Sequence, residues 1–161
     1  MDRQHSLPHH QRLRSRGSIR RLFESGKSGF VYPLRYMWYT EGAEEQGAEQ
    51  GDEQGEMTEE VIEEIAEEVV EETLENDENI KVLFTVPKRF HKRANKRNTL
   101  RRRVKESYRL QKQLLQHPDN QTDTHPRSVE IALVYSTKEF HSYKTIDHAV
   151  RKILENIAKN L

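Results

Sequence analysis

Hydrophobic residues occur in short runs along the chain, separated by long polar and charged stretches. Three runs rich in aromatic and β-branched residues predict strands over residues 30–40, 79–88 and 128–136. Apolar residues spaced three and four apart predict helices over 18–25, from about 92 to 116, and over 142–160. Strands and helices in this mixture predict an α+β fold.

The order of these elements also predicts how they pack. The strand over 79–88, the long helix and the strand over 128–136 predict a βαβ unit, within a two-layer sandwich of three main helices on one face of a small mixed sheet. Alternation in the first strand places Leu34, Tyr36 and Trp38 on one face. The expected packing side of the long helix is Leu100, Val104 and Tyr108, and that of the last helix is Tyr143, Ile146, Val150, Ile153, Leu154 and Ile157.

Two segments do not fit the pattern of a packed domain. Residues 1–16 are polar and basic without helical or strand periodicity, so we expect a flexible arm attached to a single domain over 17–161. Residues 41–79 interrupt that domain as an acidic insertion. Its first part, 42–55, is a Gly, Gln and Glu stretch typical of a flexible loop, whereas 58–74 has the spacing of an amphipathic acidic helix.

Charge is strongly segregated, although Lys and Arg total 27 and Asp and Glu also total 27. The insertion contains 18 of the acidic residues and no Lys or Arg. Elsewhere 27 basic residues face 9 acidic ones, an excess of 18 positive charges. Such an excess opposes compaction unless a polyanion or counterions screen it, so we expect a nucleic-acid partner.

The sequence has no cysteine and no apolar run near the roughly 20 residues that cross a bilayer. Residues 1–16 also lack the apolar centre of a signal peptide. These features predict a protein of a reducing compartment, the cytoplasm, with no membrane partner.

The densest positive charge is the stretch "KRFHKRANKRNTLRRRVKESYR", from Lys88 to Arg109, with eleven Lys and Arg in twenty-two positions. Opposite the apolar side of the helix, Asn98, Arg101, Arg102, Lys105 and Arg109 form a strip suited to a phosphate backbone. A solvated helix face or a localisation signal is the alternative, but only Glu106 interrupts the positive charge. A DNA-binding regulator is disfavoured by the scarcity of Asn and Gln base readers.

This stretch resembles the signature of the protein subunit of bacterial ribonuclease P. "RLRSRGSIRRLFESGKS" is similar to the first helix of that family and the Gly-Lys-Ser turn after it. The resemblance covers about three-quarters of the chain and excludes the insertion. It implies binding to the catalytic RNA by Lys88, Arg89, Lys92, Arg93, Lys96, Arg97, Asn98, Arg101, Arg102, Lys105 and Arg109. Thr99 replaces the second Arg of the family pattern, a contact that is either absent or supplied by Arg103.

The resemblance further implies a cleft between the first helix and the sheet that holds the single-stranded 5′ leader of precursor tRNA. We expect Ile19, Phe23 and a strand aromatic such as Tyr36 to line it, by stacking on bases beside a positive groove. Plain core packing is the alternative for Ile19 and Phe23. Pattern alone leaves open which of Tyr32, Tyr36, Trp38 and Tyr39 faces the cleft.

No catalytic or metal-binding residue is predicted in the polypeptide. The eight His residues lack the spacing of a zinc site, there is no Cys nucleophile, and "ESGKSG" lacks the upstream Gly of a phosphate-binding loop and is expected to be a turn. The family resemblance implies that the RNA subunit cleaves the 5′ leader with bound magnesium. The expected partners are ribonuclease P RNA and precursor tRNA, with no obligate protein partner.

A structural protein that binds ribosomal RNA is the competing function, although it would have no reason to share the Arg97-Asn98 segment and the Gly26-Lys27-Ser28 turn. The acidic insertion either folds back on the basic strip in place of RNA, or is a solvated or partner-binding segment.

Overall fold

A computed structural model describes residues 16–40, 63, 80–116 and 128–160. Their order is α1 (Arg16–Ser25), β1 (Lys27–Val31), β2 (Leu34–Thr40), β3 (Ile80–Thr85), α3 (Ala94–Gln111), α4 (Gln113–Gln116), β4 (Val129–Tyr135) and α5 (Tyr143–Asn160). The arm predicted over 1–16 lies outside these residues except for Arg16. Of the insertion predicted over 41–79, only Glu63 is among the described residues, and it is helical.

The four strands form one mixed sheet in the order β1-β2-β4-β3. β2 pairs antiparallel with β1 and β4, and β3 pairs parallel with β4. The parallel pair, joined through α3, is the predicted βαβ unit, so the α+β class and this unit are confirmed. All seven residues of β4 are buried, as expected of an apolar strand between two neighbours.

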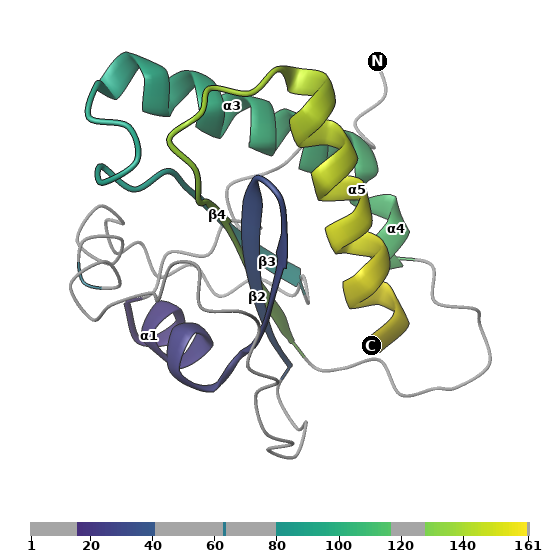
Figure 1. Ribbon diagram of the computed structural model, residues 1–161. Helices are drawn as coiled ribbons and strands as arrows, with labels where there is room; N and C mark the ends of the chain where they lie inside the picture. The colour runs from purple at the N-terminus through teal and green to yellow at the C-terminus, as the bar shows by residue number, and fades with distance from the viewer. Residues whose placement is uncertain (1–15, 41–62, 64–79, 117–127, 161) are drawn as a thin grey trace, which may run out of the picture.

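Helices cover both faces of the sheet, because α1 lies opposite α3 and α5 (Figure 1). Leu34 and Trp38 of β2 and Ile131 of β4 point into the core beneath α3 and α5. Met37 and Ala132 point to the other face, where they pack with α1. The prediction that all three main helices share one face is therefore wrong for α1.

The helix packing predictions are mostly confirmed. Leu100, Val104 and Tyr108 of α3 are buried, and so are the predicted α5 residues Ile146, Val150, Ile153, Leu154 and Ile157. Tyr143 is the exception, with 37% of its surface exposed at the first residue of α5. Burial alone raises the pKa of Tyr108 well above that of a free tyrosine, since the charged phenolate loses its hydration in this core.

The single strand predicted over 30–40 is in fact the end of β1, a turn and all of β2, which together form a hairpin. β1 begins at Lys27, so two residues of the Gly26-Lys27-Ser28 segment that we expected in a turn belong to an edge strand. A turn containing the cis Tyr32-Pro33 peptide connects it to β2. Gly, Ser and Lys have low strand propensity, and β1 is largely exposed, so neither composition nor alternation marks it.

Gly26 is required where α1 ends and β1 begins. Its N–H donates to the Leu22 carbonyl at 2.9 Å, and an added Cβ would overlap that carbonyl oxygen and lie 3.1 Å from the Trp38 carbonyl oxygen. We expect Gly26→Ala to lower the free energy of unfolding by about 2 kcal/mol, because backbone atoms must move. Urea unfolding followed by fluorescence of Trp38, the one tryptophan in the sequence, measures this loss.

Gly29→Ala is the matched control. A Cβ at Gly29 would lie 2.5 Å from the ring of Tyr36, a half-buried side chain that can rotate away. We expect a loss of about half that of Gly26→Ala or less. An equal or larger loss for Gly29→Ala would contradict the steric argument.

Candidate nucleic-acid interface

α3 and the loop before it present the predicted basic residues on the outer side of the molecule. The apolar side of α3 is fixed in the core, which leaves the opposite side accessible. Exposed members of the predicted set are Lys88, Arg89, Lys92, Arg93, Lys96, Asn98 and Arg102, and half-buried members are Arg97, Arg101, Lys105 and Arg109. The structure therefore brings the whole predicted set onto one helix and its preceding loop.

The loop before α3 is held in place by its own hydrogen bonds. Arg97 donates from Nη1 to the carbonyl oxygens of His91 at 3.1 Å and Lys92 at 2.7 Å. His91 Nε2 lies 2.9 Å from the Thr137 carbonyl oxygen, which ties the loop to the segment after β4. Arg97 thus also positions the basic loop, a role that its place in the charge pattern does not reveal.

Glu106 neutralises part of the positive charge at the end of α3. Arg109 donates from Nε to Glu106 at 3.0 Å, one turn away. This hydrogen bond is the largest influence that lowers the pKa of Glu106, so its carboxylate stays ionised beside Arg109. A phosphate at Arg109 must compete with that carboxylate, whereas Arg102 has no carboxylate partner within the part of the chain that the structure describes.

Thr99 and Arg103 are both engaged within the protein. The Thr99 hydroxyl donates to the Asn95 carbonyl oxygen at 3.0 Å, as a helical Thr commonly does. Arg103 donates to the His141 carbonyl oxygen at 2.6 Å, and its guanidinium lies 4.7 Å from the centre of the Phe140 ring. The β4–α5 loop therefore holds Arg103, and the geometry does not favour it as a substitute for the Arg missing at Thr99.

The predicted cleft residues divide between the two faces of the sheet. Ile19 is fully buried and Phe23 is half-buried against the α1 face. Tyr36 packs on the opposite face, against the core beneath α3 and α5, so its grouping with Ile19 and Phe23 is wrong. Tyr39 is the β2 aromatic that joins Phe23. The register decides this, since Tyr39 lies an even number of residues from Met37 and Tyr36 does not.

Two residues that sequence reasoning did not single out, Arg21 and Glu130, lie beside Tyr39 on the α1 face. Tyr39 and Glu130 are direct partners in the β2–β4 ladder. Arg21 of α1 donates to Glu130 Oε1 at 3.0 Å, and its guanidinium lies 4.9 Å from the centre of the Tyr39 ring. The Glu130 side chain is 4% exposed, and its Oε2 has no hydrogen-bond partner among the described residues. A lone Glu within the apolar run "SVEIALVYS" was the signal in the sequence.

The described residues contain no group of three or more His, Asp or Glu side chains placed to hold a metal ion. No helix among them has the length and apolar character needed to span a bilayer.

Comparison with known proteins extends these observations to almost the whole chain. The family model described as "Ribonuclease P" matches residues 7–158. The chain belongs to the ribonuclease P protein family. Its function is that of a protein component of ribonuclease P in the processing of tRNA 5′ ends.

Individual relatives agree with this family assignment. A protein of Porphyromonas gingivalis named "Ribonuclease P protein component" is 28% identical over 151 residues, which cover 94% of this chain and 85% of the relative. Among solved structures, the ribonuclease P protein of Thermotoga maritima has a TM-score of 0.55 at 17% identity and covers 90% of this chain and 96% of its own. That of Staphylococcus aureus has a TM-score of 0.55 at 13% identity, with 92% and 95% covered. These structures confirm the α+β fold.

Proposed function

We propose that this chain assists ribonuclease P by binding the catalytic RNA along α3 and the 5′ leader of precursor tRNA along the α1 face of the sheet. The observation that carries the proposal is the arrangement of α3. One side of this helix is fixed in the core by Leu100, Val104 and Tyr108, and the other presents Lys96 and Arg102 to solvent beside a fixed basic loop.

Phosphate recognition is the chemistry that this surface favours. Guanidinium groups offer planar, forked donors that match phosphate oxygens, and ammonium groups add unscreened positive charge. Because α3 is held by core packing and the loop by Arg97 and His91, little ordering is needed when RNA binds. Affinity arising from phosphate contacts falls steeply with salt concentration, as condensed counterions are released.

The α1 face supplies the elements of a single-strand site. Tyr39 and Phe23 are half-buried aromatics, and Arg21 and Lys81 place positive charge near the same row of the sheet. Stacking on aromatic side chains tolerates any base, which suits a leader of variable sequence. Ile19 is fully buried and acts as core, so Tyr39 replaces both Ile19 and Tyr36 in the proposed contact.

The proposal assigns the bond-breaking step to the RNA subunit and its magnesium ions. The protein's part is to neutralise phosphates, fix the basic loop against the RNA and hold the leader beside the cleavage point. We place this activity in the cytoplasm, where precursor tRNA is processed in bacteria.

Reconstitution tests the proposal directly. The full-length chain is combined with the ribonuclease P RNA of its own organism at low magnesium, and cleavage of 5′-labelled precursor tRNA is compared with that by RNA alone and by protein alone. We expect the protein to accelerate cleavage at the mature 5′ end and to be inactive by itself. Cleavage by protein alone, or an unchanged rate with protein present, would contradict the proposal.

A further inference from the structure

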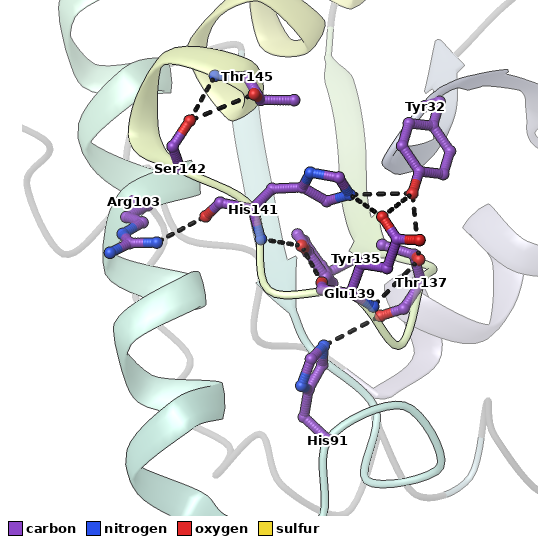
Figure 2. A network of polar contacts seen from close by, with 9 residues as sticks. All are labelled: Tyr32, His91, Arg103, Tyr135, Thr137, Glu139, His141, Ser142 and Thr145. Atoms are coloured by element: carbon purple, nitrogen blue, oxygen red, sulfur yellow. Dashed lines mark hydrogen bonds and ion pairs between the residues drawn. The ribbon is translucent and has the colours of Figure 1, made fainter.

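A connected row of aromatic rings lies where the β1–β2 turn meets the loop after β4, and Figure 2 shows four of its members, Tyr32, His141, Tyr135 and His91. Tyr32 comes from the turn, Tyr135 from the end of β4, and His91 from the loop before α3. The row, in spatial order, is Phe30, Tyr32, His141, Tyr135, His91 and Phe140.

Successive rings in this row are in contact distance of one another. The centroid distances are 6.3 Å from Phe30 to Tyr32, 5.1 Å from Tyr32 to His141 and 6.4 Å from His141 to Tyr135. They continue at 5.6 Å from Tyr135 to His91 and 6.4 Å from His91 to Phe140. Such separations fall within the range of favourable aromatic pairs.

Hydrogen bonds fix the middle of the row. The Tyr32 hydroxyl donates to Glu139 Oε2 at 2.9 Å and lies 2.9 Å from His141 Nε2. The Tyr135 hydroxyl donates to the Glu139 carbonyl oxygen at 2.6 Å and accepts from the His141 N–H at 3.1 Å. As Figure 2 shows, these bonds join the β1–β2 turn to the segment from Thr137 to His141.

Three rings of the row remain open to solvent. Phe30 is 47% exposed, Tyr32 49% and Phe140 44%. We call these three residues the aromatic platform. Phe30 and Tyr32 lie at one end of the row and Phe140 at the other. Exposed large apolar side chains commonly mark a binding site, and rings already fixed in position lose little entropy when a ligand stacks on them.

The aromatic platform continues into the basic surface of α3. The Arg103 guanidinium lies 4.7 Å from the centre of the Phe140 ring and donates to the His141 carbonyl oxygen. His91, next to Phe140 in the row, accepts from Arg97 through its carbonyl oxygen. Flat rings beside a cationic helix match the two parts of an unpaired nucleotide, the base and the phosphate.

We propose that the aromatic platform stacks unpaired bases of the RNA whose phosphates lie along α3. This inference rests on the proposed function, to which it adds a second single-strand site distinct from the one formed by Tyr39 and Phe23. The two sites lie at different places, since Tyr39 belongs to the α1 face and Tyr32 to the β1–β2 turn. The Arg103 guanidinium beside Phe140 and the basic surface of α3 favour RNA over an apolar protein partner.

Binding of two RNA probes separates stacking from charge. The full chain is titrated with a labelled 12-nucleotide oligouridine and with a 12-base-pair RNA duplex, whose bases are not free to stack. We expect the double variant Phe30→Leu/Phe140→Leu to bind the oligouridine about tenfold more weakly, because leucine keeps apolar volume without a flat ring. Its affinity for the duplex should change by less than about twofold, since the phosphate contacts remain.

Tyr143→Leu is the matched control, an exposed aromatic of α5 that is not part of the row. It should leave both affinities within about twofold of the original protein. If the double variant lost affinity equally for the two probes, or lost no affinity for the oligouridine, the proposed stacking on the aromatic platform would be contradicted.

A second measurement avoids any dependence on how the variants fold. Oligouridine carrying 5-iodouridine is photo-crosslinked to the unmodified chain, and the attached residues are identified by mass spectrometry. Crosslinks at Phe30, Tyr32 or Phe140 are expected, and their absence overturns the inference. If the protein accelerates cleavage but these crosslinks are missing, only the role of the aromatic platform is contradicted. If neither RNA probe binds, the proposed function is contradicted as well.

Discussion

Replacing Lys92, Lys96 and Arg102 by glutamine is expected to weaken binding to ribonuclease P RNA by about 100-fold. All three side chains are exposed at or near α3, and none packs in the core, so the fold should persist. A charge-assisted contact to phosphate at an exposed position contributes on the order of 1 kcal/mol, and three such losses, about 3 kcal/mol, correspond to roughly 100-fold in Kd. Filter binding at several salt concentrations measures it.

The salt dependence gives the sharper result. Each lost phosphate contact lowers the slope of log Kd against log salt concentration by about 1, so the triple variant should lose about 3. Lys144→Gln/Lys152→Gln/Lys159→Gln removes the same charge from exposed positions of α5. If this control weakened binding as much as the α3 variant, net charge rather than the surface of α3 would explain the affinity.

Replacing Tyr39 by leucine is expected to weaken binding of precursor tRNA to the reconstituted enzyme by about tenfold. Leucine retains apolar contact with Phe23 but removes the ring on which a leader base can stack. Mature tRNA, which lacks the leader, should bind as before. Comparing Kd for the two RNAs isolates the leader contact from the rest of the substrate.

Tyr36→Leu is the matched control, because Tyr36 lies on the same strand but on the opposite face of the sheet. It should change the binding of precursor tRNA by less than about twofold, although it removes packing against the core. A larger loss for Tyr36→Leu than for Tyr39→Leu would contradict the placement of the leader on the α1 face.

The local elements could be predicted from sequence because each has a distinct pattern of burial. Helical spacing identifies the core side of α3 as Leu100, Val104 and Tyr108. Glu106 is the one acidic residue of this helix, so its basic character is also evident from the sequence. The apolar run of β4 indicates a central strand. The function was predicted from the resemblance to a family, because the spacing of residues alone does not indicate it.

The first three residues of β1, Lys27 to Gly29, could not be predicted to be a strand because none of them favours strands and the edge position leaves β1 largely exposed. The sequence also does not determine which face of the sheet each helix covers. Alternation separates Tyr36 from Tyr39, but it does not say which face α1 covers. The acidic helix expected over 58–74 and its interaction with the basic strip remain predictions, since only Glu63 of that segment is described.

Charge and periodicity along the chain determined that one side of α3 is apolar and the rest strongly basic, because both properties depend on neighbours three and four residues away. Long-range packing decided what those charges and rings do. It directed Arg103 to the His141 carbonyl and His91 to the Thr137 carbonyl, placed Tyr39 beside Arg21 and Glu130, and joined Tyr32 to His141 across more than a hundred residues of chain. Such contacts depend on how distant segments meet in space, and no local pattern encodes that meeting.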